Sequence, residues 1–187
     1  MFKALLIRVA RVLSGADLPY MIIGGQAVLL YGTPRLTRDI DVTLGVGVDE
    51  MERVLKAVER IGLEIIPEDF EAFVKKTFVL PAKDSSTGIR IDLIFSFSLY
   101  EKQAIERAQP VFFDDTAVMF ASLEDVIIHK IFAGRARDME DVATIMVKNP
   151  GYDRDYIQKW LKEFDRSMET NEFSGRFQEI SRQAGGI

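Results

Sequence analysis

The residues best suited to carry chemistry are two aspartates, Asp39 and Asp41, which stand two positions apart. The surrounding segment Asp39–Leu44 (DIDVTL) alternates in character and contains β-branched residues, which predicts a β-strand. Both carboxylates then point to one face of the strand, about 7 Å apart at the backbone. Two like charges on one face are costly unless water or a cation offsets them, and hard oxygen ligands suit Mg²⁺ or Mn²⁺. An exposed acidic strand end is the alternative.

A glycine pair, Gly24-Gly25, follows the short apolar run Tyr20–Ile23 and precedes a short predicted helix over Gln26–Tyr31. Such a turn presents bare backbone amides and the positive end of a helix dipole, where a phosphate can bind. A tight turn without a ligand is the alternative. A phosphate site beside a divalent-metal site is what phosphoryl transfer from a nucleoside triphosphate requires.

A third carboxylate, Asp92, stands inside the otherwise apolar predicted strand Ile89–Phe95. Alternation places Arg90, Asp92 and Ile94 on one face of that strand and the large apolar residues on the other. Burial of an unpaired charge costs several kcal/mol, so a neighbouring cation explains an acid at this position. A salt bridge to Arg90, or an edge position, is the alternative.

The order Gly-Gly, short helix and R-x-T-x-D-I-D resembles the signature of the DNA polymerase β-like nucleotidyltransferases, with Arg35 and Thr37 as its Arg and Thr. The resemblance implies that Asp39, Asp41 and Asp92 are the catalytic, metal-binding carboxylates. It also implies that Gly24, Gly25, Arg35 and Thr37 hold the triphosphate, with Arg38 as a further source of positive charge.

The C-terminal third resembles the abortive-infection (AbiEii-like) toxins and minimal nucleotidyltransferases, through a helix lysine, Lys130, and an Arg-x-x-Asp-x-x-Asp run at Arg135, Asp138 and Asp141. In this resemblance Lys130 contacts the triphosphate; the alternative is a lysine that extends along an apolar surface. The Arg135–Asp141 run can equally be an ion-pair network between two helices. The single histidine, His129, is not needed by this chemistry.

Composition restricts the possible functions further. The chain of 187 residues has no cysteine and one histidine, so disulfides and thiolate metal sites are excluded and any metal is held mainly by oxygen. The basic and apolar N-terminus repeats its apolar residues at helical spacing, which predicts an amphipathic surface helix and not a signal peptide. We expect a cytoplasmic protein without membrane contact, and the net charge of −5 argues against a broadly basic nucleic-acid binder.

The predicted fold is α/β (α+β): a mixed nucleotidyltransferase sheet flanked by helices, followed by a C-terminal helical bundle. We expect a catalytic core over residues 1–120 and a helical region over residues 121–187 that packs on it. Further elements are expected as a helix at Asp49–Ile61 capped by Asp49, a strand at Ala72–Leu80, and helices from Ser122, Asp138 and Asp153, with a last one that ends near Ala184.

These features predict a metal-dependent nucleotidyltransferase that moves a nucleoside monophosphate from a nucleoside triphosphate to a hydroxyl or phosphate acceptor, with Mg²⁺ or Mn²⁺ as cofactor. One interpretation is that the protein is toxin-like and that its acceptor is tRNA. An enzyme of the aminoglycoside or lincosamide type, acting on a small molecule, is the alternative. A third possibility is a non-catalytic nucleotide-binding or partner-binding module of a toxin–antitoxin pair, and an antitoxin is a possible partner in either toxin-like reading.

Overall fold

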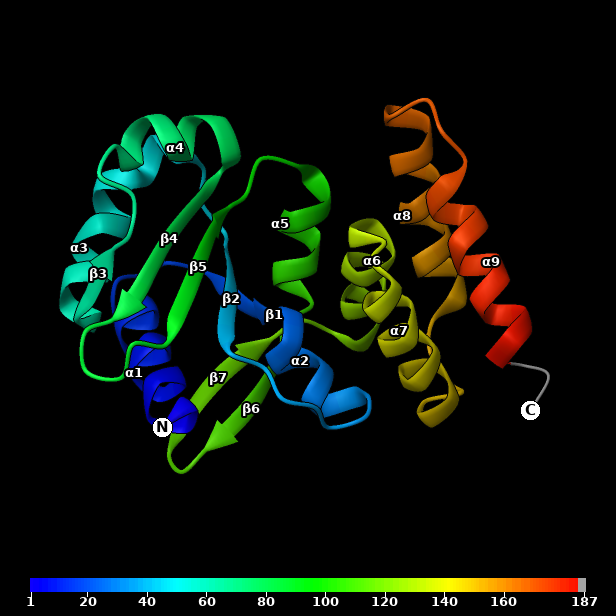
Figure 1. Ribbon diagram of the computed structural model, residues 1–187, viewed down its shortest axis with the longest axis horizontal. Coiled ribbons are helices and arrows are strands. Elements are labelled where there is room, and N and C mark those ends of the chain that lie inside the picture. The colour runs from blue at the N-terminus through cyan, green and yellow to red at the C-terminus, as the bar shows by residue number, and fades with distance from the viewer. Residues whose placement is uncertain (185–187) are drawn as a thin grey trace. The chain divides into compact units, whose positions relative to one another are not determined.

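The structure is a computed structural model that describes residues 1–184 (Figure 1). Contacts between residues divide the chain into two compact units. The first unit comprises Met1–Gln26 and Thr37–Ala121, and the second comprises Ala27–Leu36 and the chain from Ser122 onward. The sequence predicts a division after residue 120 and gives no signal that Ala27–Leu36 groups with the C-terminal part. The 1–120 and 121–187 domains therefore stay a prediction.

The first unit is built on a β-sheet that has seven strands within the described residues, in the order β3-β4-β5-β2-β1-β7-β6. Strands β2 and β5 run parallel, as do β1 and β7, and the other neighbours are antiparallel. The sheet is therefore mixed, as the sequence predicts. The strands are β1 (Tyr20–Ile23), β2 (Asp39–Leu44), β3 (Leu63–Ile65), β4 (Val79–Asp84), β5 (Arg90–Phe95), β6 (Gln109–Phe113) and β7 (Thr116–Phe120).

The helices of the first unit bury apolar faces against this sheet. Helix α1 contacts β7 and α3, and it buries Leu5, Leu6, Val9, Ala10 and Leu13. Helix α4 contacts β4, and α5 contacts β2. These helices are α1 (Phe2–Gly15), α3 (Met51–Ile61), α4 (Phe70–Thr77) and α5 (Leu99–Glu106), with a 3₁₀ turn at Val48–Glu50.

The second unit is helical in its described part, which confirms the predicted C-terminal helical region. Helix α6 contacts α7 and α8, and α9 contacts all three of them. The Ser122 hydroxyl accepts a hydrogen bond from the Asp125 amide at the start of α6, and Asp153 caps α8 in the same way through the Tyr156 amide. These helices are α6 (Leu123–Ala133), α7 (Ala136–Lys148), α8 (Arg154–Ser167) and α9 (Glu172–Ala184).

Helix α2 (Gly24–Tyr31) begins in the first unit and ends in the second. It starts at the glycine pair itself, two residues earlier than the sequence predicts. The last residue of α2 and the residue after it are bonded to the C-terminal end of α7: the Lys148 ammonium donates to the Gly32 carbonyl, and the Asn149 side-chain amide donates to the Tyr31 carbonyl. No helix among residues 1–184 is long and apolar enough to cross a bilayer.

The predicted strand over Ala72–Leu80 is wrong for most of its length, because α4 covers its first part. The Asp69 carboxylate caps α4 by accepting from the Ala72 amide. The helix ends where Phe78 adopts a left-handed backbone, with φ of 58°, and its amide donates to the Val74 carbonyl. Only the residues after Phe78 belong to a strand, β4.

Asp49 does not cap the following helix, so that prediction is also wrong. It lies inside the 3₁₀ turn Val48–Glu50, and Glu50 occupies the N-cap position of α3 without a side-chain capping hydrogen bond. The extra turn moves the start of the α-helix to Met51.

Candidate active site

The three predicted carboxylates lie on one face of two adjacent strands. In the parallel pairing of β2 with β5, Asp41 is the register neighbour of Asp92. Along β2, Ile40 and Val42 are fully buried whereas Asp39 and Asp41 are half-buried, so the two aspartates share the more open face. Residues in register on neighbouring strands point to the same side of a sheet, which places Asp92 on that face as well.

The glycine turn lies directly beside Asp41. In the antiparallel pairing of β1 with β2, Ile23 is the register partner of Asp41, so the chain turns into α2 next to this carboxylate. Gly24 has φ of 63°, a conformation that favours glycine. The side chain of Asp41 occupies the space that a β-carbon at residue 24 would need. Only a residue without a side chain therefore fits between β1 and α2.

Thr37 connects the second glycine to the first aspartate. A β-carbon at Gly25 would lie 2.9 Å from the Thr37 β-carbon, so the threonine is packed on the glycine backbone. The Thr37 hydroxyl donates to the Asp39 carboxylate over 3.2 Å, with the Asp39 carbonyl as a second acceptor at 3.4 Å. Thr37 thus holds Asp39 in this structure, whereas the sequence assigned it to the nucleotide.

Arg90 is paired with Asp92, as in the alternative left open by the sequence. The Arg90 Nε lies 2.9 Å from Asp92 Oδ1 and 3.2 Å from Oδ2. Arg90 is also the register neighbour of Asp39 across β2 and β5. The hydrogen bond and charge of Asp92, followed by the charges of Asp39 and Asp41, raise the pKa of Arg90 above its ordinary value. The guanidinium therefore lies in the field of all three carboxylates.

The donor set of Asp39, Asp41 and Asp92 fits a hard divalent cation, since it consists of carboxylate oxygens near helix-terminal amides. Histidine and cysteine, which favour zinc, are not part of it. In this conformation, no three acidic or histidine side chains among residues 1–184 converge closely enough to hold a metal ion. The suitability of this site for a divalent cation therefore rests on the type of its ligand atoms. In the same conformation Asp92 is paired with Arg90.

The other two predicted phosphate ligands, Arg35 and Lys130, meet at Asp141 in the second unit. Arg35 donates through Nε and Nη2 to the two Asp141 oxygens over 3.0 and 2.9 Å. The Lys130 ammonium lies 3.0 Å from Asp141 and 2.6 Å from Asp138. Lys130 is only 8% exposed. It is therefore a member of a buried ion-pair network and not a lysine that extends along the surface to water.

Burial alone would raise the pKa of Asp141, but the hydrogen bonds and charges of Arg35 and Lys130 outweigh it, and the pKa lies below its usual range. Asp138 also accepts from the Arg135 backbone amide at the start of α7. The Arg-x-x-Asp-x-x-Asp run thus forms the interhelical ion-pair network considered from the sequence, joined by Lys130 and by Arg35. The contact of Arg35 with Asp141 could not be predicted from local pattern, because 106 positions separate the two residues.

Two further residues considered from the sequence are Arg38 and His129. Arg38 is exposed, and the structure describes no ion pair for it. His129 lies half-buried on α6 in the second unit, next to Lys130 in sequence.

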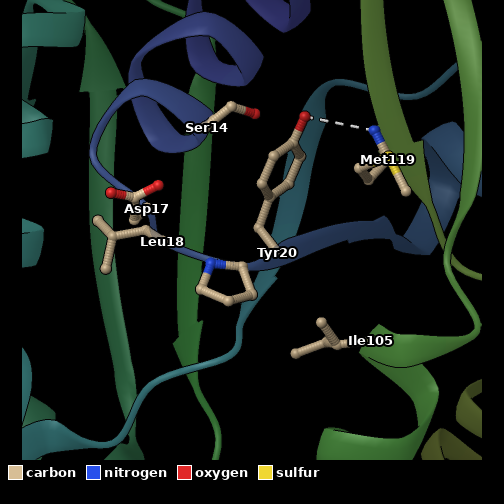
Figure 2. A pocket seen from close by; sticks show the side chains of 7 residues that line it. Ser14, Asp17, Leu18, Tyr20, Ile105 and Met119 are labelled. Atoms are coloured by element: carbon tan, nitrogen blue, oxygen red, sulfur yellow. Dashed lines mark hydrogen bonds between the residues drawn. The ribbon is translucent and has the colours of Figure 1, made fainter.

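A hollow of about 380 Å³ lies at the start of β1, the opposite end of that strand from Gly24. Figure 2 shows the Tyr20 hydroxyl there, where it accepts from the Met119 amide.

Several solved structures of other proteins share this fold. The solution structure of the antibiotic-resistance factor ANT(2'')-Ia superposes with a TM-score of 0.58 at 15% identity, over 99% of this chain and 97% of that one. A nucleotidyltransferase-like protein of Paracoccidioides brasiliensis gives 0.58 at 14% identity, over 94% and 91%. The lincosamide adenylyltransferase LnuA, in its lincomycin-bound structure, gives 0.52 at 16% identity, over 76% and 94%. Among curated protein sequences, none matches this chain.

Fold and sequence together define the class: this chain is a nucleotidyltransferase. Its residues 8–184 match the family described as "Nucleotidyl transferase AbiEii toxin, Type IV TA system". The match covers nearly the whole chain. The chain therefore belongs to the AbiEii nucleotidyltransferase family.

Proposed function

We propose that this protein transfers a nucleoside monophosphate from a nucleoside triphosphate, in a reaction that depends on a divalent cation, and that it acts as a toxin on an RNA acceptor. The observation that carries the catalytic part is the register of Asp41 with Asp92, beside the Gly24 turn. The family match over residues 8–184 supports the toxin-like reading.

In the proposed reaction an acceptor hydroxyl or phosphate oxygen attacks the α-phosphorus of the triphosphate. A new P–O bond forms, the bond to the bridging oxygen breaks, and pyrophosphate leaves. In this proposal Asp92 accepts the proton of an attacking hydroxyl. Mg²⁺ or Mn²⁺, held by Asp39, Asp41 and Asp92, would supply charge neutralisation for the triphosphate oxygens.

The remaining groups act on orientation and charge. The first amides of α2, at Gly24 and Gly25, offer donors and a positive dipole end to a phosphate. Thr37 supports the site by orienting Asp39. Lys130 and Arg35 stay predicted triphosphate ligands, and each already shares its donors with Asp141.

A transfer RNA is the acceptor we propose, and an antitoxin protein is the partner that a type IV system implies. Cytoplasmic location stays a prediction. A small-molecule acceptor is the second candidate, because the fold resembles those of ANT(2'')-Ia and LnuA.

The test is incubation of the purified chain with each α-labelled triphosphate in turn, Mg²⁺ or Mn²⁺, and either total RNA or a panel of aminoglycosides and lincosamides. We expect labelled RNA of tRNA size, no label in the drug panel, and no product with Asp41→Asn or after chelation. Label in a drug instead of RNA would replace the toxin reading by the small-molecule one. Absence of any transfer with every triphosphate and acceptor would contradict the proposed function.

A further inference from the structure

Arg90 is the residue whose position the catalytic proposal does not yet explain. A guanidinium beside a predicted metal ligand is a competing cation, because both the metal and Arg90 offer positive charge to the same carboxylate. Its Nε approaches both oxygens of Asp92, and its backbone lies in register with Asp39. Arg90 therefore contacts Asp92 through its side chain and is the register neighbour of Asp39 through its backbone.

The pair is built so that it can separate. The Arg90 side chain is 55% exposed, whereas that of Asp92 is 18% exposed. An exposed guanidinium on a flexible stem leaves its partner at little cost, since solvent-exposed ion pairs contribute little to stability. Asp92, in contrast, is fixed in the centre of β5 between two buried neighbours, Ile91 and Leu93.

We propose, on the basis of the proposed metal-dependent function, that Arg90 holds the place of the divalent cation in the metal-free protein. In this state its guanidinium neutralises part of the charge of Asp39, Asp41 and Asp92. It withdraws from Asp92 when the cation binds. Arg90 is thus a positioning residue that sets the metal affinity of the site.

The two hydrogen bonds from the Arg90 Nε to Asp92, and the register of Arg90 with Asp39, support this role, because both hold Arg90 on the face that the cation would occupy. A salt bridge with a purely structural role predicts the opposite sign: its loss would misplace Asp92 and weaken metal binding.

The chain offers a matched control for the charge. Lys83 is the register partner of Arg90 on β4, and its exposed ammonium pairs with Glu64 over 3.0 Å. Lys83→Gln removes the same unit of positive charge from the neighbouring strand, without touching Asp92. Its effect on the carboxylate site is reduced by solvent and salt.

The experiment is calorimetric titration of the full chain with Mn²⁺ alone, without nucleotide, at about 0.15 M salt. We expect Arg90→Gln to bind Mn²⁺ about three- to tenfold more tightly than the wild type, and Lys83→Gln to differ by less than about twofold. Arg90→Met is the second variant, and melting curves establish that each variant is folded. In an Asp92→Asn background, Arg90→Gln should lose most of its effect, because the carboxylate for which both cations compete is gone.

Weaker or unchanged Mn²⁺ affinity in both Arg90 variants would overturn the inference and leave the proposed function intact. An equal gain in Lys83→Gln would overturn it as well, because general charge would then explain the effect. No Mn²⁺ binding to any variant would overturn both this inference and the metal dependence proposed above.

Discussion

The carboxylate of Asp41 lies against the α-carbon of Gly24, in the space that any larger side chain at residue 24 would occupy. This contact joins the turn that ends β1 to the central strand of the carboxylate face. It makes the glycine a requirement of the site as well as of the turn.

Gly24→Ala should lower both stability and nucleotidyl transfer. The left-handed backbone costs an alanine about 1 kcal/mol, and the overlap with Asp41 adds to it and moves the carboxylate. Urea unfolding and a transfer assay measure the two effects. Gly175→Ala in α9, where nothing lies within 4 Å of the added carbon, is the control and should be neutral or slightly stabilising. Equal effects of the two substitutions would remove the special role of Gly24.

Thr37→Val should reduce transfer by about tenfold, because Asp39 loses the hydroxyl that orients it and one hydrogen bond is worth about 1 kcal/mol. Thr37→Ser keeps the hydroxyl and should retain most of the activity. If Thr37 binds the triphosphate instead, Thr37→Val should raise KM for the nucleotide and leave kcat nearly unchanged. Steady-state kinetics of the two variants separate these outcomes.

Asp92→Asn should lower the rate of nucleotidyl transfer by orders of magnitude, while the fold is retained. The amide keeps the shape of the carboxylate and relieves its repulsion with Asp41, and only the half-exposed pair with Arg90 is lost. Melting temperature and triphosphate binding should change little. A marked loss of stability with activity preserved would show that Asp92 is structural and that the third metal ligand lies elsewhere.

Lys130→Met should destabilise the chain by about 3–5 kcal/mol, because Asp138 and Asp141 would stay buried without their shared cation. The double variant Lys130→Met, Asp138→Asn restores the charge balance and should recover part of the loss. Lys3→Met, which breaks an exposed pair with Asp114, is the control and should change little. Urea unfolding decides; a small effect of Lys130→Met would contradict the buried network.

Acid should weaken the second unit through Asp141. Its pKa is lower in the folded chain than in the unfolded one, so its contribution is complete above the unfolded value of about 3.9 and is lost as the pH falls through the folded value. Asp141→Asn lowers stability at neutral pH and should flatten the fall of the unfolding free energy below about pH 4. Equal acid slopes in the variant and the wild type would refute the assignment.

The sequence predicted the parts of the fold that local pattern determines. Strands β1 and β2 begin and end where their apolar and alternating segments do, and the alternation of β5 places Asp92 on the open face as expected. The capping box at Ser122 and Asp125 predicts the start of α6, and the helix predicted from Asp153 corresponds to α8, whose N-cap is Asp153. The Asp39, Asp41 and Asp92 cluster could thus be anticipated before any coordinates.

Other elements depend on signals that are weak in a single sequence. The hairpin of β6 and β7 turns at Asp114-Asp115, where Asp114 has φ of 55°, and no glycine marks that turn. An acidic pair between two apolar runs was the available signal for it. The end of α4 at Phe78 is equally unmarked, since an aromatic residue rarely adopts a left-handed backbone.

The charge pairs of the site were the least predictable feature. Arg90 and Asp92 are two residues apart, and the sequence left their pairing open beside the metal role. The Lys130 network requires the turn at Gly134, which brings α7 back along α6, and the Arg35 contact with Asp141 requires the full tertiary fold. Such contacts are set by packing and not by local pattern.

The grouping of Ala27–Leu36 with the C-terminal helices has a consequence for biosynthesis. The ribosome delivers this segment about a hundred residues before Asp141, Lys148 and Asn149, which hold it in the finished protein. A nascent chain that has emerged only as far as Ala121 therefore carries all seven strands, but the segment between Gln26 and Thr37, which precedes the predicted catalytic aspartates in the sequence, is not yet anchored. Completion of α7 is then the event that secures this loop, so a ribosome-bound fragment is expected to remain inactive until translation has passed residue 149.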